Sequence, residues 1–88
     1  MDKRAMQILF EHLWWASDNC TCPIEHVWFP VQEAAKSSGV RRLEIVDYFK
    51  ILLEKKIIEK TSDKPLLFEF TEFGKGIKTN EDIEKYVK

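Results

Sequence analysis

The sequence predicts an α+β fold that is mostly helical, with a three-helix core, a short strand, a two-stranded β-hairpin and a C-terminal helix. Three stretches predict it. Residues 2–17 are rich in apolar side chains at helical spacing, residues 31–55 suggest two helices around Gly39, and residues 57–70 contain two β-prone runs. A chain of 88 residues has room for one domain, which we expect to span residues 1–88.

The first predicted helix, residues 2–17, is apolar around more of its girth than one contact requires. Trp14 and Trp15 point about 100° apart on a helix, so they can be buried only against different neighbours. The helix is therefore either the centre of the core or also part of an interface between two copies of the chain.

A loop and a short strand come next. Pro23 prevents the first helix from continuing through residues 18–25, and the β-prone run at residues 26–29 predicts the strand. Pro30 suits a helix entry, where its missing N–H is not needed, so a helix is expected over residues 31–38.

A tight turn at Gly39 joins this helix to a second one, residues 40–55, because glycine accepts a positive φ without steric cost. The second helix has one apolar face, formed by Val40, Ile45, Tyr48, Phe49, Leu52 and Leu53. Its other side carries Arg41, Arg42, Asp47 and Lys50. This is the layout of a helix-turn-helix, whose second helix lies in the DNA major groove; the alternative is a helical hairpin without a nucleic-acid role.

Residues 57–60 and 66–70 are the predicted strands of the hairpin, and the turn cluster at residues 61–65 separates them. Alternation in the second strand puts Leu66, Phe68 and Phe70 on one face and Leu67 and Glu69 on the other. After the hairpin, Thr71 and Glu72 offer an N-cap and an acidic first turn for a short helix. Residues 79–82 offer a second helix start, followed on one side by Ile83, Tyr86 and Val87.

The charge of the chain is unevenly distributed, although the net charge is only −1. Residues 36–64 contain eight Lys and Arg against five Asp and Glu, a balance of +3, and the remainder has six against ten, or −4. A basic middle in an acidic frame suits one binding face for a polyanion. The alternative is the mixed charged surface that most soluble domains have.

Three segments together resemble the winged-helix transcriptional regulators, including those of the MarR and PadR kind. They are VQEAAKSSGVRRLEIVDYFK, the LLEKKIIEK passage from helix to hairpin, and FEFTEFG at the end of the second strand. The resemblance covers residues 6–76 and implies a double-stranded DNA-binding protein, a small transcriptional regulator, that inserts residues 40–55 in the major groove. The sequence departs from the family in placing Arg41, which cannot cap a helix, where Ser or Thr is usual.

The resemblance also implies which side chains contact DNA. Arg41 and Arg42 stand at the helix start, and each guanidinium could bind O6 and N7 of a guanine. Val46 could contact a thymine methyl group, and Asp47 could accept a hydrogen bond from cytosine. The expected phosphate contacts and hairpin cations are Lys36, Lys50, Lys60 and Lys64. The alternative is that these charges are simply solvated.

Two thiols and two imidazoles lie within fifteen residues, at His12, Cys20, Cys22 and His26. These are ligand types for tetrahedral zinc, but C-x-C is not the usual zinc spacing, and His12 lies on the apolar flank of a helix. We therefore expect no metal and no other cofactor, and a pair of free thiols that could respond to oxidation.

Other function classes receive little support from the sequence. It contains no glycine-rich phosphate loop and no carboxylate pair in an apolar frame, so no catalytic residue and no enzyme activity are expected. No run of about 18 apolar residues and no signal stretch is present, which predicts a cytoplasmic protein without a membrane partner.

A homodimer is expected, because a symmetric pair of modules reads two half-sites and binds more tightly than one. The residues predicted at its interface are Trp14, Trp15, Ile83, Tyr86 and Val87. The alternative is a winged-helix module that binds another protein through exposed tryptophans and its acidic frame, without binding DNA.

Overall fold

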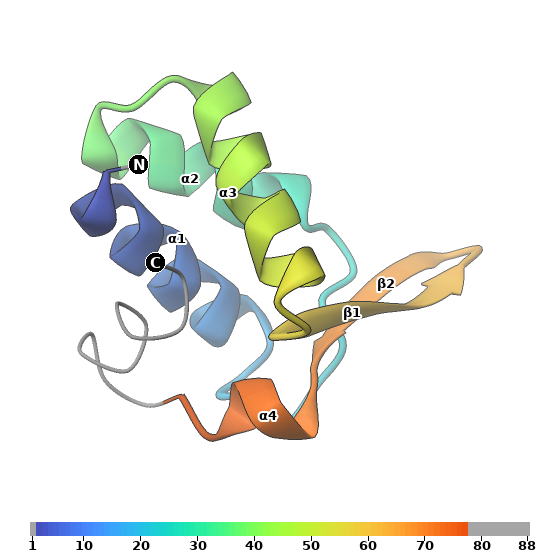
Figure 1. The fold of residues 1–88 in the computed structure, drawn as a ribbon. Helices are drawn as coiled ribbons and strands as arrows, with labels where there is room; N and C mark the ends of the chain where they lie inside the picture. The colour runs from blue at the N-terminus through green and yellow to red at the C-terminus, as the bar shows by residue number, and fades with distance from the viewer. Residues whose placement is uncertain (1, 78–88) are drawn as a thin grey trace.

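The computed structural model describes residues 2–77, which form three helices, an antiparallel β-hairpin and a short final helix (Figure 1). The elements are α1 (Lys3–Ala16), α2 (Trp28–Ser38), α3 (Arg42–Glu54), β1 (Ile58–Asp63), β2 (Leu66–Phe70) and α4 (Glu72–Lys75). The predicted α+β class and the order of these elements are confirmed. The second helix start predicted at residues 79–82 lies outside the described residues.

The first helix, α1, begins and ends close to the predicted limits. The Asp2 carboxylate caps it by accepting a hydrogen bond from the Ala5 N–H at 3.1 Å. The backbone N–H of Asp2 donates to the Tyr48 hydroxyl at 3.0 Å, which connects the start of α1 to α3. The apolar stripe of α1 is the centre of the core, because Met6, Leu9 and Leu13 are completely buried.

The strand predicted at residues 26–29 is wrong, because α2 already begins at Trp28. Pro30 is the third residue of α2, where the backbone N–H that proline lacks would have no helical partner. The strand pairing occurs earlier, at Ile24, which forms an isolated antiparallel bridge with Phe68. Ile24 N–H donates to the Phe68 carbonyl at 2.7 Å, and Phe68 N–H donates back at 3.1 Å.

The turn between α2 and α3 is built as predicted. Gly39 has a φ of 75°, in the left-handed region, and its N–H donates to the Ala35 carbonyl at 3.0 Å. Arg41 occupies the N-cap position of α3, as expected from the sequence. Because arginine has no acceptor for the free N–H groups of the first turn, α3 begins without a side-chain cap.

The hairpin is longer than predicted and has a tighter turn. β1 continues to Asp63, so the predicted turn at residues 61–65 shrinks to Lys64 and Pro65. The register shifts between Lys60, which pairs with Phe68, and Ser62, which pairs with Leu67. A bulge of this kind leaves one extra residue in β1 and lets pairing continue beyond it. The hairpin projects from the helices as a two-stranded arm (Figure 1).

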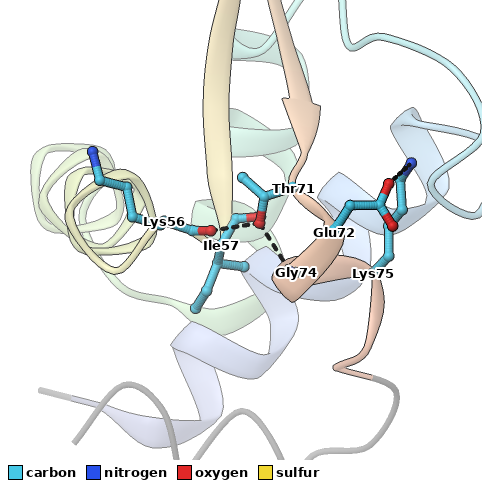
Figure 2. A network of polar contacts seen from close by, with 6 residues as sticks. All are labelled: Lys56, Ile57, Thr71, Glu72, Gly74 and Lys75. Carbon is cyan, nitrogen blue, oxygen red and sulfur yellow. Dashed lines mark hydrogen bonds and ion pairs between the residues drawn. The ribbon is translucent and has the colours of Figure 1, made fainter.

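The base of the hairpin is fixed by four residues that we call the hairpin root: Lys56, Ile57, Thr71 and Gly74 (Figure 2). The Thr71 hydroxyl donates to the Lys56 carbonyl and accepts a hydrogen bond from the Gly74 N–H at 2.9 Å. Thr71 N–H also donates to the Ile57 carbonyl at 3.0 Å. Thr71 therefore caps α4, as predicted, and also connects α4 to the end of α3.

Candidate nucleic-acid interface

The outward face of α3 follows from its helical period. Ile45, Phe49 and Leu52 are buried in the core, so positions displaced from them by about half a turn face solvent. That face consists of Arg42, Leu43, Asp47, Lys50 and Glu54, all exposed, with the half-buried Val46 at its side. It combines apolar side chains with two cations and two acids.

Three of the cations predicted to contact DNA form ion pairs with acidic side chains of the chain itself. The Arg41 guanidinium lies 3.2 Å from Glu44, the Lys60 ammonium 2.7 Å from Asp63, and the Lys36 ammonium 3.9 Å from Glu33. Such exposed pairs contribute at most about 1 kcal/mol, so DNA phosphates could displace them.

Three of the predicted cations stand apart from these pairs. Among residues 2–77, Arg42, Lys50 and Lys64 form no ion pair. Arg42 and Lys50 lie on the outward face of α3, two helical turns apart, and Lys64 lies in the exposed turn of the hairpin. The structure thus places unpaired positive charge on the two elements that were predicted to contact DNA.

A groove that we call the α2–α3 notch lies beside this face. Its lining residues are Trp28 and Gln32 from α2 and Arg42, Leu43 and Val46 from α3. Leu43 is 76% exposed and Trp28 is 57% exposed, so neither side chain contributes much to the core. Sequence reasoning predicted Arg42 and Val46 here but missed Trp28, Gln32 and Leu43.

Only one of the missed residues had a sequence signal. Leu43 lies off the apolar stripe of its helix, on the side that should be polar, and an apolar residue at such a position is a sequence signal for a contact outside the core. Trp28 and Gln32 join the notch because α2 begins earlier than predicted and crosses α3, which no local pattern reveals.

A second apolar surface lies on the α1 side of α2. Trp15 is 64% exposed and Phe29 is 66% exposed, and both line a pocket with His12, Ala16 and Pro30. We call this surface the Trp15–Phe29 patch. Trp14, by contrast, is half-buried and contacts the rings of Phe10 and Phe70 at centroid distances of 5.9 and 6.2 Å. The other predicted interface residues, Ile83, Tyr86 and Val87, lie outside the described residues.

The four possible zinc ligands are not brought together. Within residues 2–77, no three His, Cys, Asp or Glu side chains form a group that could hold a metal ion. The His12 ring packs edge-on against Trp15 at a centroid distance of 5.3 Å, and His26 is exposed. Cys20 and Cys22 are both free thiols.

The two thiols differ in their surroundings. Burial raises the pKa of the Cys20 thiol above its ordinary value, although a hydrogen bond with Ser17 and the positive charge of Lys75 act in the opposite direction. Cys20 therefore holds less thiolate at neutral pH than an unperturbed cysteine would. Cys22 is exposed, so it is the more accessible of the two to an oxidant or alkylating reagent.

Comparisons of the chain with protein-family models, with curated proteins and with solved structures found no match. In the described part of the chain, no helix has the length and apolar character needed to cross a membrane.

Proposed function

We propose that this chain is a winged helix-turn-helix protein that binds double-stranded DNA, with α3 in the major groove and the hairpin as its wing. The order of the elements supports the proposal, because a helix-turn-helix is followed directly by an antiparallel hairpin. The isolated bridge between Ile24 and Phe68 adds a third chain segment to the edge of the hairpin, where the winged-helix layout includes a short strand.

The observation that carries the proposal is the outward face of α3. It is exposed, and its cations Arg42 and Lys50 form no ion pair among the described residues. A helix presented in this way can enter a groove about 12 Å wide, where Arg42 is positioned to address base edges. Regulation of transcription is the role that best suits a small DNA-binding domain of this kind.

The experiment is a binding titration by fluorescence anisotropy on a duplex selected from a random library. We expect the double variant Arg41→Ala, Arg42→Ala to bind about tenfold to a hundredfold more weakly, because each arginine can discriminate a guanine. A matched control, Lys3→Ala with Arg4→Ala, removes the same charge from exposed positions on α1.

Two results would contradict the DNA-binding proposal. One is equal binding by the wild type and the α3 double variant. The other is an affinity that does not fall as salt rises, because phosphate contacts release counterions and make binding salt-dependent.

A second candidate, a module that binds protein, is favoured by the Trp15–Phe29 patch. Large aromatic side chains exposed together are typical anchors of a protein interface. The simplest partner is a second copy of the chain, which would also give DNA binding a two-fold symmetry. Analytical ultracentrifugation at micromolar concentration tests this. We expect the wild type to be a dimer and Trp15→Ala to dissociate more readily. A monomeric wild type would contradict the dimer, and the patch would then have to bind a different protein.

A further inference from the structure

The α2–α3 notch is unusual for a face that would address nucleic acid, because its exposed centre is apolar. Leu43 and Trp28 are mostly in solvent, and Val46 is half-buried beside them. The folded chain gains little from apolar side chains that remain exposed, and three of them gathered in one groove form a surface that an apolar group of a ligand can cover.

The major groove offers one apolar group to such a surface. Of the four bases, only thymine carries a methyl group, at C5, and this methyl lies on the major-groove edge. Leucine and valine side chains beside a tryptophan ring can exclude water from a methyl group, which polar side chains could not do.

Two polar groups border the notch and suit the bases around that methyl. The Gln32 amide can bind N6 and N7 of adenine, the partner of thymine in the same base pair. Arg42 can bind O6 and N7 of a guanine in the neighbouring pair. The apolar wall and these two groups therefore match an A·T pair next to a G·C pair.

The charge around the notch favours DNA over an apolar protein segment as its occupant. Arg42 is the charged residue of the lining and forms no ion pair among residues 2–77, whereas Lys50, one helical turn beyond Val46, stands beside the acids Asp47 and Glu54. An unpaired guanidinium on an apolar notch complements a polyanion that carries methyl groups, which describes thymine-containing duplex DNA.

The geometry points to the α2–α3 notch as the specificity-determining site of the DNA-binding face, where Trp28, Leu43 and Val46 receive the C5-methyl group of a thymine. This inference rests on the proposed DNA binding and goes beyond it, because it assigns the base preference to apolar contact. Gln32 and Arg42 then fix the orientation of the base pair relative to the notch.

The test replaces each thymine of a selected duplex, one at a time, by deoxyuridine, which removes only the methyl group. For the wild-type protein we expect one or two positions where this weakens binding about fourfold, as one buried methyl group should. Leu43→Ala and Trp28→Ala should bind the thymine and deoxyuridine duplexes equally. Phe73→Ala is the matched control: Phe73 is an exposed aromatic residue that lines neither the notch nor the Trp15–Phe29 patch, so this variant should keep the preference.

The possible failures separate the two proposals. If the wild type binds the selected duplex but no deoxyuridine position weakens binding, the methyl site is overturned and DNA binding stands. If Leu43→Ala keeps the full preference for thymine, the contact lies elsewhere and the notch is overturned. If the library yields no bound duplex, DNA binding itself fails. Circular dichroism of each variant ensures that a loss of binding is not a loss of fold.

Discussion

At the hairpin root, the backbone of Ile57 leaves no room for a side chain at Gly74 and accepts a hydrogen bond from the Thr71 N–H, whereas in the α2–α3 notch Trp28 and Leu43 are mostly exposed. A Cβ atom added to Gly74 would lie 2.0 Å from the Ile57 carbonyl oxygen, far inside van der Waals contact. Substitutions in the root therefore act on folding, and substitutions in the notch should act on binding. The difference separates residues that hold the fold from residues that are available for function.

The largest expected effect comes from Gly74→Ala. The new methyl group cannot fit against the backbone of Ile57, so α4 must move away from β1, and we expect a loss of about 3 kcal/mol or more in the free energy of unfolding. Urea denaturation measures it. Gly76→Ala is the control, because its Cβ would lie 3.4 Å from the nearest atom, the Phe73 carbonyl oxygen, and should change stability by less than about 1 kcal/mol. Equal effects of the two substitutions would refute the close contact.

The next effect concerns the hydroxyl of Thr71. Thr71→Val keeps the shape of the side chain but removes the cap of α4 and the hydrogen bond to the Lys56 carbonyl, which should cost about 1–2 kcal/mol. Thr61→Val removes a hydroxyl from an exposed residue of β1 and should leave the thermal midpoint nearly unchanged. A Thr71→Val protein as stable as the wild type would mean that the root is held by packing alone.

A smaller effect of opposite sign is expected at Lys56. Its φ of 61° is in the left-handed region, and Ile57 N–H donates to the Leu52 carbonyl at 3.0 Å, so α3 ends in a motif that favours glycine. Lys56→Gly should raise the free energy of unfolding by about 0.5–1 kcal/mol, because a side chain in this conformation is strained. Lys55→Gly, at a φ of −79°, has no strain to relieve and should not stabilise the protein. The two urea midpoints should therefore move in different directions.

The smallest effect on stability is expected in the notch itself. Leu43→Ala should change the free energy of unfolding by no more than about 0.5 kcal/mol, since its side chain is mostly in solvent. The buried neighbour Ile45→Ala should cost about 2–5 kcal/mol in the same helix. If Leu43→Ala were strongly destabilising, the notch would belong to the core and would not be free to bind a ligand.

Much of the fold could be predicted because its signals are local. The apolar stripe of α3, the positive φ of Gly39 and the cap at Thr71 each depend on a few neighbouring residues. The run FEFTEFG is part of the resemblance to winged-helix regulators, and the structure supplies the physical reason for its threonine and its glycine: Thr71 caps α4, and Gly74 leaves room for the Ile57 carbonyl.

The candidate site was predicted in part for the same reason. The place of Arg42 and Lys50 on the polar side of a helix follows from its period, and both do lie on the outward face of α3. The pairing of Arg41 with Glu44 was not predicted, although side chains three residues apart on a helix can meet.

The sequence by itself determined the helices and the two hairpin strands in their order, though not all their limits, and the polar face of α3, since these depend on the spacing of residues within one segment. The tertiary structure alone decided that Ile24 pairs with Phe68, that Trp14 is covered within the chain while Trp15 is not, and that Trp28 stands beside Leu43. These facts depend on contacts between segments far apart in the sequence, where the free energy of packing the whole core outweighs local preference. The notch is therefore a product of how α2 crosses α3, which no pattern within either helix specifies.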